Sequence, residues 1–369
     1  MKIKAILCFL ITFSVCASPL KIVTFNTGLA HGFVARADQR LPEIAKAIGS
    51  MDADVVCLQE VWNEEDAAQI MQSAKKNFPY KFSSPSKQKK TGDTPSCGLG
   101  DLFGSHGYAR CLVSNCIRKS GDAFTDCAIK SCGEDMLYLV KNNRECALAL
   151  QAQVGKNPLI AVLNVLNPFS AADTFAYHGS NGVLLLSRSP MEGRRVLDFF
   201  DISTLTYRVA LKAMVNHEQN QYAVYCTHLT ANLDHVATYA GTVTSWQDEN
   251  KAQATRLLSE AQEEAGPVII AGDFNCSIAN PSINVIGDME KSCRMFLEAG
   301  FEEGLAKFHP QCTFCRGNSI NSEGVNSTID HILVKKGHTI SSQVIFKNED
   351  SKVLPLSDHF GIASEVVAP

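Results

Sequence analysis

The chain has 369 residues, a formal net charge of −4, 45% hydrophobic residues and 20% charged residues. These proportions are ordinary for a soluble globular protein, and they exclude a disordered chain, a collagen-like fibre and a coiled-coil rod. Fourteen cysteines are more than a typical cytosolic enzyme of this size carries, which favours an oxidising compartment. The mild acidity gives no strong electrostatic field for binding a polyanion.

The first 17 residues have the pattern of a secretory signal peptide. Lys2 and Lys4 precede an apolar stretch over residues 5–15, and small residues lead to an expected cleavage site after Ala17. The stretch is shorter than the roughly 20 residues of a membrane-spanning helix. Lipid modification of Cys16 is an alternative that the bulky Val15 disfavours. We expect a secreted or periplasmic protein with no transmembrane segment, in which cleavage leaves twelve cysteines.

The mature chain begins with alternating strand and helix patterns. Residues 21–26 and 54–60 are short apolar runs that predict strands, and the second run is apolar on both faces, as in a strand covered on two sides. Between them, Leu41, Ile44 and Ile48 recur at helical spacing, with Pro42 near the helix start. Residues 63–77 predict a second helix.

Residues 83–178 lose this pattern and form a predicted insertion. The segment is rich in Gly, Ser and Lys, and it holds six of the cysteines within fifty residues. Six cysteines can close three bridges in fifteen ways. A zinc site is the alternative, but the Cys-x4-Cys spacings do not match the usual ligand spacing. We expect a disulfide-stapled insertion containing Cys97, Cys111, Cys116, Cys127, Cys132 and Cys146.

The strand and helix patterns resume after the insertion. Residues 208–215 and 222–229 flank a polar turn and predict a hairpin. Residues 246–263 predict a helix. Further strands are expected over residues 182–187, 267–272, 329–334 and 361–366. The sequence therefore predicts a layered α/β protein.

Four of the other cysteines lie near the predicted strands and loops of the core. Cys57 and Cys226 fall within buried strands, where we expect packed free thiols rather than a bridge. Cys312 and Cys315 are expected to bridge either each other or Cys293.

Polar side chains interrupt the carboxyl ends of the predicted strands. Catalytic groups of layered α/β proteins cluster beyond strand ends, where loops converge. A carboxylate directly after a buried apolar run is costly to bury unless it is paired or binds a cation. The candidate residues are Asn26, Glu60, His228, Asp273, Asn275, Asp330, Asp358 and His359.

Six short motifs carry these residues in order along the chain: Thr24-Phe-Asn26, Leu58-Gln-Glu60-Val61, Thr227-His228-Leu229, Gly272-Asp-Phe-Asn275, Ile329-Asp330-His-Ile-Leu and Ser357-Asp358-His359. Together they resemble the endonuclease/exonuclease/phosphatase superfamily, which includes DNase I-like nucleases, neutral sphingomyelinases and inositol-phosphate phosphatases. The resemblance covers about residues 20–82 and 179–367. It implies an α/β (α+β) fold, a four-layer sandwich of two packed mixed β-sheets flanked by helices, and metal-assisted attack of water on a phosphoester.

The resemblance also implies a metal site. Glu60 would hold the ion with Asn26 beside it, and Asp358 would assist or serve only to position His359. Carboxylate and amide oxygens suit Mg²⁺, with Mn²⁺ as an alternative.

The same resemblance implies the catalytic roles. His359 would be the general base toward the attacking water, and Asp330 would orient it and stabilise its protonated form. Asp273 and Asn275 would hold and polarise the water or the phosphate oxygens. His228 would donate a hydrogen bond to the phosphoryl oxygen as charge develops, unless it is only a core residue.

A phospholipid is the preferred substrate. Thr227-His228-Leu229 and residues 181–190 resemble secreted and neutral sphingomyelinases more closely than DNases. The insertion also offers an interfacial loop, in which Phe169, Phe175 and Tyr177 would contact a lipid surface transiently; packing of these aromatic rings in the core is the alternative.

Three other functions remain open. A DNase I-like endonuclease acting on nucleic acid would need a basic surface, which Lys75, Lys76, Lys87, Lys89 and Lys90 could supply unless they only solvate a loop. A phosphoinositide or sugar phosphatase would need further basic residues. A catalytically inactive binding protein with the same fold is disfavoured by the intact set of motif residues.

Overall fold

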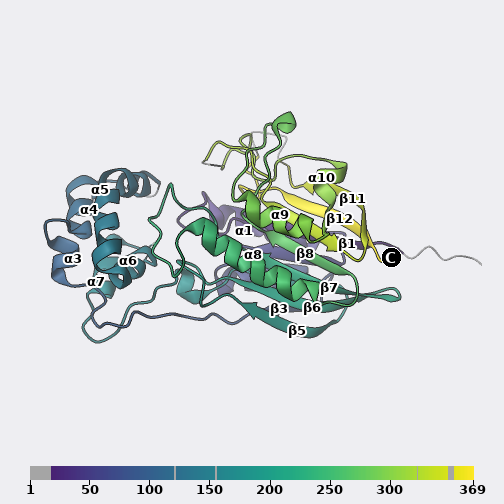
Figure 1. The fold of residues 1–369 in the computed structure, drawn as a ribbon, viewed down its shortest axis with the longest axis horizontal. Helices are drawn as coiled ribbons and strands as arrows, with labels where there is room; N and C mark the ends of the chain where they lie inside the picture. Colours follow the sequence, from purple (N-terminus) through teal and green to yellow (C-terminus); the bar gives the residue numbers. More distant parts are fainter. Residues whose placement is uncertain (1–17, 120–121, 154–155, 322, 348–352) are drawn as a thin grey trace, which may run out of the picture.

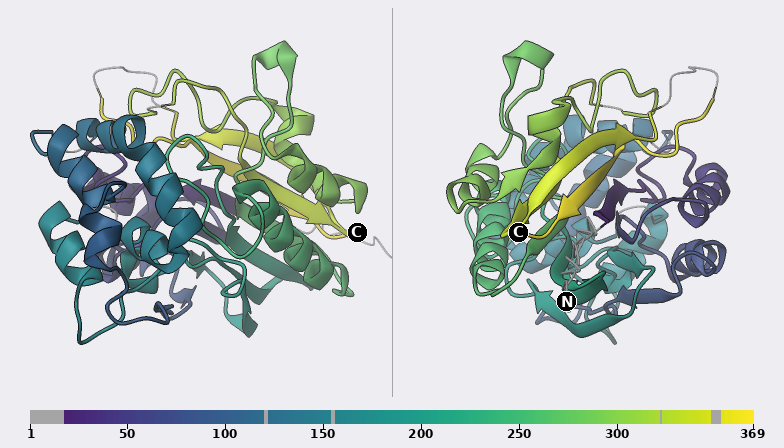
Figure 2. Two further views of the ribbon diagram at one scale, coloured as in Figure 1. Left: turned by 60° about the vertical axis from the view of Figure 1, so that its left-hand side comes forward. Right: turned by 90° about the vertical axis from the view of Figure 1, so that its right-hand side faces the viewer.

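The computed structural model describes residues 18–119, 122–153, 156–321, 323–347 and 353–369 (Figure 1). The predicted signal peptide, residues 1–17, lies outside the described residues. Two mixed six-stranded sheets pack against each other and carry helices on their outer sides (Figures 1 and 2). The predicted four-layer α/β sandwich is confirmed.

Both sheets combine parallel and antiparallel neighbours. The first has the order β11-β12-β1-β2-β4-β3, and the second has the order β5-β6-β7-β8-β10-β9. The strands of the first sheet are β1 (Leu20–Asn26), β2 (Val55–Gln59), β3 (Tyr80–Ser83), β4 (Leu184–Ser187), β11 (His338–Ile345) and β12 (Gly361–Val367). Those of the second are β5 (Met191–Asp198), β6 (Val209–His217), β7 (Asn220–His228), β8 (Val268–Asp273), β9 (Glu302–Glu303) and β10 (Asp330–Lys335).

The apolar runs predicted as strands are buried on both faces because each sheet lies between two layers. Successive side chains of a strand point to opposite faces. In β1, Ile22 belongs to the core between the sheets and Val23 to the core beneath the outer helices. In β8, Ile269 faces the other sheet and Ile270 faces the helices. This alternation removes from water the aliphatic surface that drives folding, at about 25 cal/mol per Å².

The outer helices cover the sheets with one apolar face each. On the first sheet these are α1 (Ala37–Gly49) and α2 (Glu64–Ala74), and on the second they are α8 (Trp246–Gln262) and α9 (Glu290–Glu298). A short helix, α10 (Gly304–Phe308), and two 3-10 turns, η1 (Tyr177–Gly179) and η2 (Pro281–Ile283), complete the sandwich. The helix predicted over residues 246–263 is confirmed; it begins after Ser245, whose hydroxyl accepts a bond from the Asp248 amide at 3.1 Å.

The cysteine-rich segment is helical. It contains α3 (Leu99–Phe103), α4 (Tyr108–Asn115), α5 (Asp122–Asn142), α6 (Arg144–Gln151) and α7 (Pro158–Val165). We call the described residues between 91 and 172 the helical lobe; it lies at one end of the sandwich (Figure 1). Its three disulfides are nested, which confirms the bridge interpretation over the zinc alternative: Cys97–Cys146 encloses Cys111–Cys132, which encloses Cys116–Cys127.

The sandwich carries three more disulfides. The expectation of free thiols at Cys57 and Cys226 is wrong, because the two residues meet in the core between the sheets and form a bridge. Cys312 and Cys315 pair with each other, one of the two predicted alternatives. The last bridge, Cys276–Cys293, joins the segment after β8 to α9. Among the described helices, none combines the length and the apolar content needed to cross a bilayer.

Candidate active site

The strand directions place the predicted site residues at one edge of the sandwich. β1 runs parallel to β2, and β7 runs parallel to β8, so the carboxyl ends of all four strands meet there. β10 runs antiparallel to β8, and β12 runs antiparallel to β1. Asp330 therefore opens β10, and Asp358 and His359 precede β12. The expectation that these three follow strand carboxyl ends is wrong, yet the antiparallel pairing brings them to the same edge.

Asn26 links residues from the two sheets at this edge. Its Nδ2 donates to Oε1 of Glu60 at 3.2 Å and to Oδ2 of Asp273 at 2.8 Å. Its Oδ1 accepts a bond from the Gly28 amide at 2.9 Å, which fixes the orientation of the carboxamide. Asn26 is fully buried, so two carboxylates from different sheets are held by one rigid amide.

His359 and Asp330 form a buried pair. Nδ1 of His359 lies 2.9 Å from Oδ2 of Asp330, and the Phe314 ring packs against the imidazole. Burial alone would lower the pKa of His359, but the charge of Asp330 and the hydrogen bond to it, followed by the charges of Asp358 and Asp273, raise that pKa well above its usual value. The Asp330 carboxylate thus stabilises the imidazolium that forms when His359 accepts a proton.

Asp273 contacts Asn26 and also lies close to the pair of His359 and Asp330. Ligand atoms of Asp273, Asp330 and His359 lie within 4.8 Å of one another. Burial, and next the charge of Asp330, raise the pKa of Asp273 to about 7. The Asn275 amide donates to Oδ1 of Asp273 at 2.8 Å, and Nδ2 of Asn275 donates to the Leu229 carbonyl at 3.0 Å, so the motif Gly272-Asp-Phe-Asn275 is locked in place.

His228 is the uncharged histidine of the site. Its Nε2 lies 3.5 Å from Oδ2 of Asp273, and its Nδ1 is buried with no hydrogen-bond partner among the described residues. Burial, followed by the charges of Arg208 and His359, lowers the pKa of His228 well below its usual value. A neutral imidazole can donate one hydrogen bond without adding charge to the site.

Glu60 and Asp358 form the acidic part of the site. Burial, and next the charge of Asp358, raise the pKa of Glu60. Oε2 of Glu60 is buried without a hydrogen-bond partner among the described residues. Gly28 makes room for Asp358, since a Cβ at Gly28 would lie 2.5 Å from Oδ1 of Asp358. Two neighbouring carboxylates, one with an unused buried oxygen, fit a divalent cation.

Arg208 is a site residue that the sequence analysis missed. It is buried, its Nε and Nη1 have no hydrogen-bond partner among the described residues, and its guanidinium lies 5.6 Å from the Trp62 ring. A buried cation with unused donors is suited to an anion such as a phosphate. The sequence did contain an indication of Arg208. It directly precedes the apolar strand β6, which pairs with β7, the strand that ends at the predicted site residue His228.

A cavity of about 460 Å³, lined by both polar and apolar residues, lies beside Trp62. Its walls come from the start of α2, the end of β3 and residues 180–184, and they include Ser84 and Asn181. Trp62 stacks on Tyr177, with ring centroids 4.7 Å apart. Gly182 admits the indole, because a Cβ there would lie 2.7 Å from Trp62 Cε3. None of the catalytic or metal-site candidates lines this cavity; Trp62, two residues after Glu60, is the lining residue that connects it to the site.

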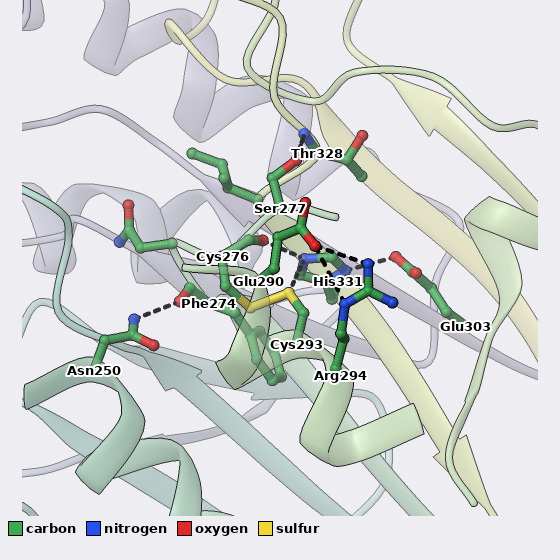
Figure 3. Close-up of a disulfide and its surroundings, with 12 residues drawn as sticks. Asn250, Phe274, Cys276, Ser277, Glu290, Cys293, Arg294, Glu303, Thr328 and His331 are labelled. Carbon is green, nitrogen blue, oxygen red and sulfur yellow. Dashed lines mark hydrogen bonds and ion pairs between the residues drawn. A yellow bond between two sulfur atoms is a disulfide. The ribbon is translucent and has the colours of Figure 1, made fainter. Parts of the chain in front are cut away.

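A second set of contacts surrounds His331 and the Cys276–Cys293 disulfide (Figure 3). His331, next to Asp330, has Nδ1 2.5 Å from Oε1 of Glu303 and Nε2 2.9 Å from the Cys276 carbonyl oxygen. The Cys276–Cys293 bridge lies against the same imidazole, 3.5 Å from Nε2. Burial alone would lower the pKa of His331, but the charge of Glu303 and the hydrogen bond to it raise that pKa to about 9.

Glu303→Gln is expected to lower the free energy of unfolding at pH 6 by about 2 to 4 kcal/mol, because it leaves the imidazolium of His331 buried without its partner. His331 has a folded pKa of about 9, raised from 6.5, so its contribution is complete below pH 6.5 and is lost as the pH rises through 9. The difference between wild type and variant should therefore shrink over this range.

Urea unfolding at pH 6, 7.5 and 9.5 measures this difference. Glu302→Gln, which alters the neighbouring, more exposed carboxylate paired with Lys307, is the matched control. A destabilisation by Glu303→Gln that stays constant across the three pH values would contradict a charged His331.

Comparisons with known proteins agree with this arrangement. The family model of the endonuclease/exonuclease/phosphatase family matches residues 23–359. A search of curated proteins found no match. Among solved structures, sphingomyelinase C from Streptomyces griseocarneus has 16% identity and a TM-score of 0.52, covering 95% of this chain and 99% of that one.

Two TDP2 structures show the same fold. A humanized TDP2 from D. rerio has 13% identity and a TM-score of 0.53, over 95% of this chain and 99% of the other. TDP2 from C. elegans has 13% identity and a TM-score of 0.52, over 95% and 75%. These likenesses concern the fold, and the family follows from the match over most of the chain. The chain belongs to the endonuclease/exonuclease/phosphatase family.

Proposed function

We propose that the protein is an exported, metal-dependent phosphodiesterase that hydrolyses a phospholipid by attack of water. The observation that carries this proposal is the buried pair of His359 and Asp330, which lies on one edge of the sandwich with Asp273, Asn26 and Glu60. A phosphoester hydrolase needs a base for water, donors for the phosphoryl oxygens and compensation of negative charge.

His359 takes the proton from the attacking water through the nitrogen that does not face Asp330. The negative charge of Asp330 favours the imidazolium that forms, which is why the pKa of His359 is raised. Asp273 and Asn275 orient the water and the phosphate. His228, kept neutral, donates a hydrogen bond to a phosphoryl oxygen. The unused donors of Arg208 would stabilise charge on the transferred phosphoryl group.

Glu60, Asn26 and Asp358 are proposed to hold a divalent metal, Mg²⁺ or Mn²⁺. A bound divalent cation would supply neutralisation of phosphate charge. Glu60→Gln is expected to raise the Mg²⁺ concentration for half-maximal activity at least about tenfold, since the ion loses a charged ligand. Titration of activity against Mg²⁺ measures this. Glu64→Gln, an exposed carboxylate on α2, should leave the titration unchanged; equal curves for both variants would remove Glu60 from the metal site.

A phospholipid fits better than nucleic acid because the proposed basic surface is partly neutralised. Lys87 pairs with Asp198 at 2.7 Å, and Lys90 pairs with Asp173 at 3.2 Å. A phosphate-tracking surface depends on lysines whose charge is free to replace counterions. The likeness in fold to sphingomyelinase C is compatible with a lipid, while TDP2 has a similar fold, so the fold alone does not choose the substrate.

A substrate panel tests the proposal. The protein is incubated with Mg²⁺ and sphingomyelin vesicles, plasmid DNA or an inositol phosphate, with EDTA as a control. Release of phosphocholine supports the proposed function. Nicking of DNA without release of phosphocholine would favour the endonuclease alternative, and release of phosphate alone would favour a phosphatase.

Export remains part of the proposal. The six disulfides of the described residues are consistent with an extracellular location, because such bridges persist in oxidising compartments. The signal-peptide pattern of residues 1–17 supports the same conclusion, and amino-terminal sequencing of the exported protein should begin at Ser18.

A further inference from the structure

The helical lobe exposes an unusual share of the large apolar side chains. Ten of the seventeen exposed large hydrophobic residues in the described part of the chain lie in it, although it is a minor part of the sequence. Single exposed apolar residues are normal, but a concentration of them on one unit marks an interaction surface.

The strongest concentration is on α7 and the turn that follows it. Residues 157–169 contain no charged side chain. Leu159, Leu163 and Phe169 are 68%, 60% and 92% exposed, and Ile160 is also exposed. Leu159 and Leu163 are one helical turn apart and therefore share a face. We call these four residues the α7 patch.

Helix α7, which carries most of the patch, is packed firmly against the rest of the lobe. The opposite side of α7 is packed, because Val165 is fully buried in the core of the lobe. The Cys97 amide donates to the Val165 carbonyl at 3.0 Å, and Cys97 is bridged to Cys146. Helix α7 is thus apolar on both sides: one side builds the lobe, and the other has no partner among the described residues.

The chemistry of the patch fits the hydrocarbon side of a lipid surface. Protein interfaces are enriched in aromatic residues, Met and Arg and carry a polar rim, whereas three of the four patch residues are aliphatic and residues 157–169 include no charged side chain. Exposed Leu and Phe side chains are among the residues that enter the headgroup boundary of a bilayer, and no charged residue within 157–169 opposes this insertion. Lys89 lies on the segment that pairs with residues 172–174, three residues after Phe169 at its nearest point, and its charge complements lipid phosphates.

The patch is continuous with the active site. After Phe169, residues 172–174 pair with residues 89–91. The chain then reaches Tyr177, whose ring stacks on Trp62. Trp62 is two residues after Glu60. Arg144 and Gln151 of the lobe also donate to the carbonyls of Ala240 and Thr238, in the segment that follows β7. The lobe therefore lies beside the site edge. Ser18, the first described residue, lies away from the patch. Its carbonyl oxygen is 3.0 Å from Nε2 of His217, the last residue of β6, at the edge of the sandwich opposite the site.

We propose that the α7 patch inserts into the outer part of a phospholipid bilayer and holds the active site over the membrane surface. This inference rests on the proposed function for the identity of the substrate, but the binding itself does not require catalysis. It also corrects the predicted interfacial loop: Phe169 is exposed, while Phe175 is buried and the half-buried Tyr177 stacks on Trp62.

Cosedimentation of the full exported chain with vesicles of phosphatidylcholine and sphingomyelin tests the proposal. The triple variant Leu159→Ser, Leu163→Ser, Phe169→Ser is expected to lower the vesicle-bound fraction at least about tenfold, because three apolar contacts with lipid are lost. The matched control Ile286→Ser, Leu297→Ser, Ile340→Ser removes three exposed apolar side chains outside the lobe and should bind as the wild type does.

Hydrolysis of the soluble ester bis(p-nitrophenyl) phosphate separates binding from chemistry. The α7 variant should keep this activity within about twofold while losing activity on vesicles. Wild-type protein that does not cosediment, or a triple variant that binds as well as the wild type, would overturn the proposal. A wild-type dimer that becomes a monomer in the triple variant would overturn it in favour of a second copy. Vesicle binding without hydrolysis of any phosphoester would refute the proposed function and leave the surface assigned.

Discussion

His359→Ala is expected to lower kcat for phosphodiester hydrolysis by about 10³-fold, within the range typical for loss of a general base. The imidazole is buried, held by Asp330 at 2.9 Å, and surrounded by three carboxylates that favour its protonated form. Alanine removes the proton acceptor and leaves the carboxylates in place. Steady-state kinetics on a soluble phosphodiester and on vesicles measure the loss, and circular dichroism verifies that the fold is kept.

A double-mutant cycle separates His359 from its orienting partner. Asp330→Asn should keep the imidazole but lower its pKa, and the double variant should lose little more than His359→Ala alone, because the two residues act as one unit. His338→Ala, which changes an exposed histidine on β11, is the matched control. Turnover of His359→Ala near the wild-type value would remove His359 from the mechanism.

The position of the site could be predicted because its residues follow or precede strongly apolar strands. Asn26, His228 and Asp273 each end a buried strand, and Glu60 directly follows one, so local sequence alone locates them. That they converge depends on strand direction, a long-range property. For Asp330 the local pattern misplaced the residue on its strand, and only the antiparallel pairing with β8 explains why it still reaches the site.

Elements with weak apolar patterns escaped prediction. β5 is largely exposed along its length, and β3 has four residues, so neither has the buried run by which the other strands are recognised. The lobe helices other than α5 have five to eight residues, and the lobe is held by disulfides, which periodicity does not reveal. The Cys57–Cys226 bridge was missed for a related reason. Each cysteine looks like a buried apolar residue of its own strand, and their contact exists only after the sheets pack.

Arg208 and Arg40 show why burial alone does not identify a functional cation. Both guanidinium groups are buried. Arg40 donates to the carbonyl oxygens of Ala35, Thr27, Leu356 and Gly28 at 2.5 to 3.0 Å, so its charge is fully used by the fold. Nε and Nη1 of Arg208 have no hydrogen-bond partner in the described part of the chain. Arg40 therefore serves the fold, whereas the unpaired donors of Arg208 are those that we propose bind the phosphoryl group.

Arg208→Met is therefore expected to lower kcat by about 10²-fold or more, the loss typical for removal of a donor that stabilises transition-state charge. Its free energy of unfolding should stay within about 1 kcal/mol of the wild type or rise, because a buried guanidinium with two donors unpaired among the described residues contributes little to stability and methionine fills a similar volume. Arg40→Met, in contrast, should lower the free energy of unfolding by about 3 kcal/mol or more, because four carbonyl oxygens lose their hydrogen-bond donor.

Urea unfolding and kinetics on a soluble phosphodiester compare the two variants. Arg208→Lys, which keeps the charge but loses the planar fork of donors, should fall between the wild type and Arg208→Met in kcat. Inorganic phosphate should raise the melting temperature of the wild type and not that of Arg208→Met, because the free donors bind the anion only when they are present. A variant Arg208→Met that unfolds as easily as Arg40→Met, or that keeps its turnover, would show that Arg208 supports the fold and does not act on the phosphate.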